Sequence, residues 1–158
     1  MHQQIFPVYN RIMSDDNYKK FEADCDRLMK KNVVILEEFR TWLEAQDLSK
    51  KVIDAHIGNA GFYIDHYLLH YDAIPAAEGA PSIGGFLGRW FIHKALWANE
   101  SSIRATATSL KKFYTFMVER GLTPPEDLEI LKEDIKEEMA EWLEELKQFD
   151  SLADENVL

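Results

Sequence analysis

The chain has 158 residues, of which 46% are hydrophobic and 12% aromatic, and its formal net charge is −10. This length fits one domain with a sizeable core. No run of about 18 apolar residues occurs, so we predict no membrane span. The N-terminus lacks the basic and apolar regions of a signal peptide, and the single Cys25 has no internal disulfide partner. We therefore expect a cytoplasmic protein.

The net negative charge of the chain comes from its C-terminal segment. Residues 123–158 contain 13 acidic residues and three lysines, whereas residues 1–122 contain 15 acids and 15 bases. Because phosphate binding depends on Lys and Arg, an overall acidic chain is unusual for a nucleic-acid binder. The neutral body, however, still allows a local basic face.

Helical spacing of apolar residues recurs along the chain and strand-like alternation does not, which predicts an all-α protein. The first helix is expected to start near Ser14, and Lys30-Lys31-Asn32 either ends it or lies within it. A second helix is expected over 33–45 and a third over 50–71, with Tyr71 in the core. Gly58 and Gly61 inside the third helix suggest the close approach of a neighbouring helix.

The second half of the chain begins with a predicted loop over 74–81. Residues 83–98 are apolar on nearly all sides, which indicates a buried helix or one that needs a partner surface. The next helix is expected to be capped by Ser101 or Ser102 and to end at Gly121.

The last predicted helix opens with a capping-box pattern, Thr123-Pro124-Pro125-Glu126, and runs to about Phe149, followed by a frayed tail over 151–158. It carries one apolar stripe: Leu128, Leu131, Ile135, Met139, Trp142, Leu146 and Phe149. This stripe can pack on the body, pair with a second copy as a coiled coil, or dock on a partner protein. The acidic helix can also imitate DNA and mask a basic face.

Two stretches resemble a known module. Leu48-Ser49-Lys50-Lys51-Val52-Ile53 and the longer stretch from Ser101 to Tyr114, which continues to Glu119-Arg120-Gly121-Leu122, resemble two helices of the N-terminal core-binding domain of tyrosine recombinases (phage integrases). The similarity covers roughly residues 33–122. It implies a small helical bundle that grips DNA, here with an extra N-terminal helix and a long acidic C-terminal helix.

The candidate DNA-binding residues follow from this resemblance and from helical spacing. Matching family positions are Lys50, Lys51, Arg104, Lys111 and Lys112. On the helix from Ser102, Arg104, Thr108, Lys111 and Lys112 share one side, where long cations reach phosphates and Thr108 can donate a hydrogen bond. Alternatively, this is the ordinary solvated face of an amphipathic helix. The family usually has further Arg and Lys on the earlier helix, where this chain has Asp54, His56, Asn59 and Asp65.

No catalytic or metal site is expected. A tyrosine recombinase needs a second domain with a His-x-x-Arg element and a nucleophilic Tyr, and no histidine here is followed by Arg three positions later. His66 and His70 share a helix face, but zinc requires at least a third ligand. Cys25 has the spacing of a core residue. We therefore predict no enzyme activity and no cofactor.

These observations lead to one interpretation and one alternative. Residues 1–122 form a core-binding-like domain, and residues 123–158 form an acidic helix and tail on the same domain. The function is a non-catalytic, integrase-type module that binds duplex DNA. The alternative is a protein-interaction adaptor that keeps the fold without DNA binding, with a protein partner or self-association through the C-terminal helix.

Overall fold

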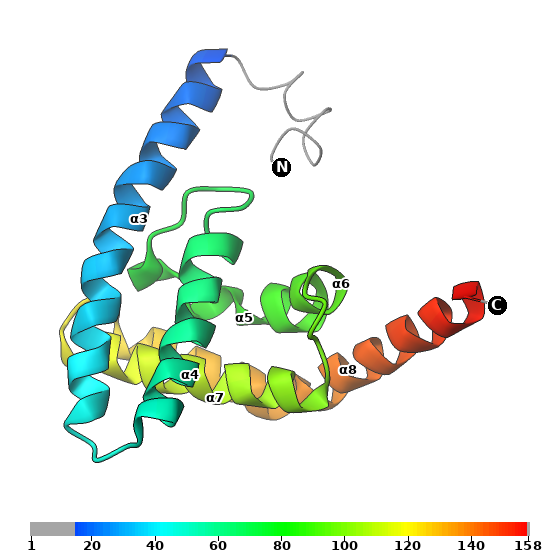
Figure 1. The fold of residues 1–158 in the computed structure, drawn as a ribbon. Helices are drawn as coiled ribbons and strands as arrows, with labels where there is room; N and C mark the ends of the chain where they lie inside the picture. Colours follow the sequence, from blue (N-terminus) through cyan, green and yellow to red (C-terminus); the bar gives the residue numbers. More distant parts are fainter. Residues whose placement is uncertain (1–14, 158) are drawn as a thin grey trace.

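The computed structural model describes residues 15–157, and within this range it contains helices and turns but no strand. The all-α prediction is confirmed. Three long helices are joined to one shorter helix and a group of short turns (Figure 1). The elements are α3 (Asp15–Glu44), α4 (Lys50–Phe62), η1 (Tyr63–Tyr67), η2 (Ala76–Glu78), η3 (Ala80–Ser82), α5 (Ile83–Gly85), η4 (Phe86–Trp90), α6 (Phe91–Lys94), α7 (Glu100–Glu119) and α8 (Pro125–Val157).

Helix α3 is continuous, so Lys30-Lys31-Asn32 lies within it and the two predicted helices are one. Asn32 is buried, and its Nδ2 donates to the Ile64 carbonyl at 3.3 Å and to Asp65 Oδ1 at 2.8 Å. These bonds tie the middle of α3 to η1, while its first turns project from the body (Figure 1). The predicted start at Ser14 lies outside the described residues.

Helix α4 is shorter than predicted because it changes into a π-helical turn. The Leu68 amide donates to the Tyr63 carbonyl at 3.0 Å, the i to i+5 pairing of a π turn. The chain leaves the helix after Tyr67, and Tyr71 is 48% exposed, so its predicted core position is wrong. The glycine prediction is also wrong at Gly58, where a Cβ would meet nothing within 4 Å. A Cβ on Gly61 would make only ordinary contact with Leu36.

The loop after η1 is fastened to the core by two buried tyrosines. Tyr63 Oη donates to the Gly79 carbonyl at 2.6 Å, and Tyr114 Oη donates to the Ala76 carbonyl at 2.8 Å. Burial raises the pKa of both phenols, so both remain protonated donors.

The predicted helix over 83–98 is interrupted and ends early. It consists of α5, the π turn η4 and α6, and Ala95 is extended, with φ −89° and ψ 118°. Phe86, Leu87 and Phe91 are buried as expected. Leu96 and Trp97 lie beyond the helix end and are exposed, so the first of the two alternatives, a buried helix, does not hold for residues 95–98.

Helix α7 passes through the centre of the fold. Asn99 caps it, since Asn99 Oδ1 accepts from the Ser102 amide at 2.7 Å and Ser102 Oγ accepts from the Asn99 amide at 2.9 Å. The predicted cap at Ser101 or Ser102 is wrong, because Asn99 is the N-cap residue and Ser102 is the third residue of the helix. The predicted end is confirmed by Gly121, whose φ of 73° suits glycine at this position.

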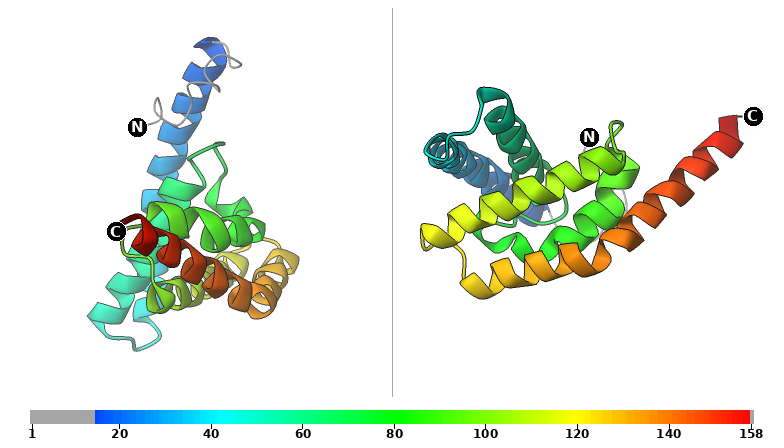
Figure 2. Two further views of the ribbon diagram at one scale, coloured as in Figure 1. Left: turned by 90° about the vertical axis from the view of Figure 1, so that its right-hand side faces the viewer. Right: turned by 90° about the horizontal axis from the view of Figure 1, so that it is seen from below.

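Helix α8 packs along α7 and over η3, α5, η4 and α6 (Figure 2). Its stripe is buried against the body, with Leu131 0% and Trp142 4% exposed. The capping-box prediction is wrong, because the helix begins at Pro125 and the Thr123 hydroxyl donates to the Ala77 carbonyl at 2.9 Å. The frayed-tail prediction is also wrong, because the helix continues to Val157.

Candidate nucleic-acid interface

The candidate residues of α7 form a strip that no other helix covers. Viewed from below, α7 lies between α4 and α8 with its near side open (Figure 2, right). Arg104 and Thr108 are exposed, and Lys111 and Lys112 are half-buried. They follow one side of the helix because steps of three and four residues return to the same face. The strip runs along the side of α7 that faces away from the core.

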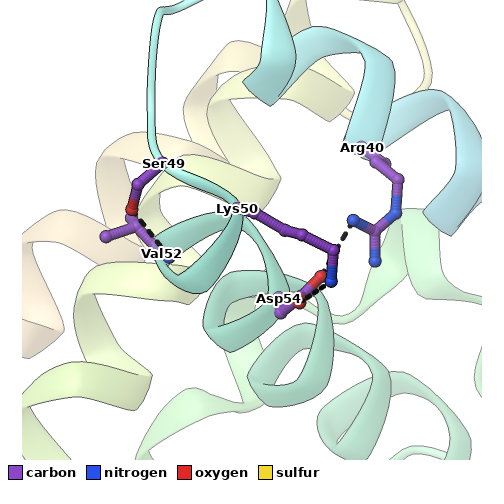
Figure 3. Close-up of polar contacts among 5 residues, drawn as sticks. All are labelled: Arg40, Ser49, Lys50, Val52 and Asp54. Carbon is purple, nitrogen blue, oxygen red and sulfur yellow. Dashed lines mark hydrogen bonds and ion pairs between the residues drawn. The ribbon is translucent and has the colours of Figure 1, made fainter.

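The other two candidate lysines are at the start of α4. Ser49 caps the helix by accepting from the Val52 amide at 3.3 Å, which places Lys50 and Lys51 in the exposed first turn (Figure 3). Lys50 Nζ lies 2.8 Å from Asp54 Oδ2, and Arg40 of α3 lies 3.0 Å from Asp54 Oδ1. The hydrogen bond from Lys50, followed by that from Arg40, lowers the pKa of Asp54. Asp54 therefore partly neutralises this end of the interface.

A shallow groove between α7 and α8 collects three cations. Its volume is about 300 Å³, and its lining contains no acidic residue. The lining residues are Arg104, Ala107, Thr108, Lys111, Ile135, Lys136 and Met139. The structure thus brings together three of the predicted residues and adds Lys136 from the acidic helix. Sequence reasoning missed Lys136 because it considered only the net charge of that segment.

Two of the groove residues already have local partners. Arg104 Nε lies 3.1 Å from Glu100 Oε2, an exposed pair of the kind that contributes at most about 1 kcal/mol. Such a pair can be exchanged for a phosphate contact at little cost. The Thr108 hydroxyl donates to the Arg104 carbonyl at 3.1 Å, so its proton is used within α7. In this arrangement Thr108 does not supply the donor expected from the sequence.

Four cations of the interface remain available. Within the described part of the chain, Lys51, Lys111, Lys112 and Lys136 have no acidic partner within 4.0 Å. Lys51 belongs to α4, Lys111 and Lys112 belong to α7, and Lys136 belongs to α8. Two helices, α7 and α8, therefore contribute unpaired positive charge to one groove.

A buried polar cluster beneath the strip joins α4 to α7. His56 Nδ1 lies 2.7 Å from Ser109 Oγ, which also accepts from Asn59 Nδ2 at 3.0 Å. Burial, followed by the nearby charge of Lys112, lowers the pKa of His56. The cluster sets how the start of α4 lies relative to α7 and hence the position of the candidate cations. Ser109 is 1% exposed, so its hydroxyl is not accessible as a nucleophile.

The remaining titratable candidates do not form a second site. Among residues 15–157 no three His, Cys, Asp or Glu side chains are grouped so that they could hold a metal ion. His66 is exposed and His70 is buried. Cys25 is half-buried and its Sγ donates to the Leu69 carbonyl at 3.7 Å. Burial, with Asp26, Asp24 and Glu22 nearby, raises its pKa to about 11, so the thiol is protonated at neutral pH.

Comparisons with known proteins add no family assignment. No family model, curated protein or solved structure matched the chain. Within the described residues, no helix has the length and apolar character needed to cross a bilayer.

Proposed function

We propose that this chain is a non-catalytic, integrase-type module that binds duplex DNA through the α7 strip and the groove beside it. The observation that carries the proposal is the groove itself, in which Arg104, Lys111 and Lys136 line one hollow without an acidic residue. Lysine and arginine side chains on a helix flank contact phosphates and release condensed counterions, which drives association with DNA.

The position of the cations supports DNA rather than an ordinary solvated face. A solvated helix in an acidic chain has no need to gather its bases opposite those of a neighbouring helix, whereas a phosphate backbone requires cations from several elements. Arg104 and Lys111 of α7 and Lys136 of α8 meet that requirement in one groove. The proposal concerns binding only, because the chain lacks the recombinase set of arginines, His-x-x-Arg and nucleophilic tyrosine.

The test is a titration of a labelled mixed-sequence duplex, followed by fluorescence anisotropy at several salt concentrations. We expect binding at low salt that weakens steeply as salt rises. The combined change Arg104→Ala, Lys111→Ala and Lys112→Ala should abolish it without unfolding the protein. A matched control changes Lys19, Lys30 and Lys31 of α3 to Ala. These residues are exposed, so the control removes the same amount of positive charge from another part of the surface. Absence of binding at low salt, or binding that survives the interface change, would refute the proposal.

A second candidate function, a protein-interaction adaptor, is favoured by an apolar groove at the opposite end of α4. It has a volume of about 390 Å³ and includes the exposed Met29 and Trp97. Its lining consists of Cys25, Met29, Phe62, Asp65, His66, Leu69, His70, Trp90, Lys94 and Trp97. Aromatic and apolar walls of this kind suit an apolar segment of a partner protein.

The adaptor can be tested with the dye anilinonaphthalene sulfonate, which fluoresces on apolar surfaces. We expect the folded protein to bind the dye and the combined change Met29→Gln and Trp97→Ala to weaken that binding. The same change should leave DNA affinity unaltered. If the native protein does not bind the dye, the adaptor loses its structural support.

A further inference from the structure

The three lysines of α8 lie on one line of an otherwise acidic helix. Lys132, Lys136 and Lys147 are separated by four and eleven residues, which correspond to about one and three helical turns. Side chains at such spacings project from the same edge. We call these three residues the lysine edge of α8.

The lysine edge lies toward α7. Lys136 lines the cationic groove together with Arg104 and Lys111. Lys147 lines the hollow that continues from it, together with Asn99, Glu100 and Arg104. Lys132 lies one turn from Lys136 and 3.7 Å from Glu129 Oε1, both exposed on α8. Two residues of the lysine edge, Lys136 and Lys147, therefore border Arg104 of the α7 strip.

Acidic residues mark the other edge of α8. Glu138 lies against Gly84 of α5, with its Oε1 3.7 Å from the place of a Cβ there. Glu145 Oε1 lies 3.6 Å from His93 Nε2 of α6. The burial of Glu138 and its acidic neighbours raise its pKa. The net charge of α8 thus conceals an uneven distribution: acids occur on both edges, whereas the three lysines share one.

We propose that α8 forms a second wall of the DNA site, with Lys136 and Lys147 binding phosphates of one strand that follows the groove between α7 and α8. This inference rests on the proposed function. The distance from Lys132 to Lys147 along the helix is about 22 Å, from 1.5 Å per residue. One strand of duplex DNA carries a phosphate about every 3.4 Å of helix axis, so this edge is as long as roughly six base-pair steps along the duplex axis.

The contribution of the two lysines differs. Lys147 does not line the acid-free groove. Lys136 borders both the acid-free groove and the hollow around Lys147, and that hollow includes Glu100, Glu144 and Asp150. These carboxylates reduce the local positive potential and repel phosphate. Lys136 is therefore the main contact of α8, and Lys147 is the weaker one.

The test measures DNA affinity against salt for the full-length chain and for Lys136→Ala and Lys147→Ala. The logarithm of affinity falls with the logarithm of salt at a slope of about −0.9 per phosphate contact, so Lys136→Ala should reduce the slope by about 0.9. Lys147→Ala should reduce it by less. Lys19→Ala, which removes the same charge from the exposed first half of α3, serves as the control and should leave the slope unchanged.

The outcomes separate this inference from the proposed function. If Lys136→Ala keeps the native slope while the triple change on α7 abolishes binding, α8 is not a wall of the site and the proposed function stands. Tighter binding after Lys136→Ala would also overturn the inference. If the native chain binds no duplex at low salt, both proposals fail.

Discussion

Helix α7 is held by two neighbours through different chemistry. Toward α8 the contact includes part of an apolar stripe that also packs on η4, and Leu131 and Trp142 of this stripe are almost fully buried. Toward α4 it includes the polar cluster of His56, Asn59 and Ser109. The stabilisation from apolar burial grows with the area removed from water, whereas a buried polar cluster depends on every member keeping its partner. The first contact should therefore resist changes of pH, and the second should respond to them.

The largest effect is expected at the apolar contact. Trp142→Ala should lower the free energy of unfolding by about 3–5 kcal/mol, because it removes a buried aromatic side chain and leaves a cavity. Urea unfolding followed by circular dichroism measures the change. Ile130→Ala on the same helix is the control, since Ile130 is 43% exposed and should matter by no more than about 0.5 kcal/mol. Equal effects of the two changes would show that the stripe does not hold α8.

The polar contact should be disrupted by Ser109→Ala. The change leaves His56 Nδ1 and Asn59 Nδ2 without their shared partner and should cost about 1–3 kcal/mol. Ser101→Ala, in the exposed first turn of α7, is the control and should be nearly neutral. If Ser109→Ala leaves the free energy of unfolding unchanged, the α4–α7 contact is stabilised by its apolar residues alone.

Glycine substitutions sharpen the comparison at the apolar contact. A Cβ on Gly88 would lie 2.7 Å from Trp142 Cδ1, so Gly88→Ala should cost about 1–2 kcal/mol through overpacking, after the helix-propensity gain. Gly58→Ala in α4 meets nothing within 4 Å and should stabilise the protein by about 0.5–1 kcal/mol. Thermal unfolding should show a lower melting temperature for Gly88→Ala and a higher one for Gly58→Ala. A stabilising Gly88→Ala would mean that the Trp142 ring moves freely.

The smallest effect is a pH dependence at the polar contact. The pKa of His56 is lower in the folded protein than the value of about 6.5 expected when it is unfolded. Below about pH 6.5 the unfolded chain therefore binds a proton that the folded chain resists. Stability should be complete above this pH and should fall as pH decreases toward the folded pKa. His56→Gln should remove this component, which is measured as the difference in unfolding free energy between pH 7.5 and pH 5.5. Identical pH profiles for the two proteins would contradict this account.

Local sequence signals predicted much of the helical framework. Gly121 follows the end of α7 as expected. The residue at this position adopts a positive φ, which favours glycine, so the helix end can be recognised in the sequence. The stripe of α8 is buried because its spacing follows the helical period. The cap of α7 is Asn99 rather than the predicted serine. Asn99, Ser101 and Ser102 are all suitable capping residues, and only the observed hydrogen bonds distinguish them.

Features that depend on distant partners were not predictable. The helices end at Tyr67, the last residue of one π turn, and at Lys94, shortly after the other, so Tyr71 and Trp97 lie outside them and are exposed. Asn32 can be buried in the middle of α3 because its side chain donates hydrogen bonds to a carbonyl and a carboxylate oxygen of η1. The position of such partners follows from the packing of segments more than 30 residues apart.

The sequence alone determined the all-α class, the confinement of acidic charge to the last segment and the spacing that places Arg104, Thr108 and Lys111 on one side of a helix. These properties depend on composition and on the helical period, both of which are local. Only the tertiary structure decided that Lys136 lies opposite Arg104 and Lys111, that Asp54 pairs with Arg40, and that His56 meets Ser109. Such pairings join separate helices, and their geometry arises only when the apolar faces of those helices pack together.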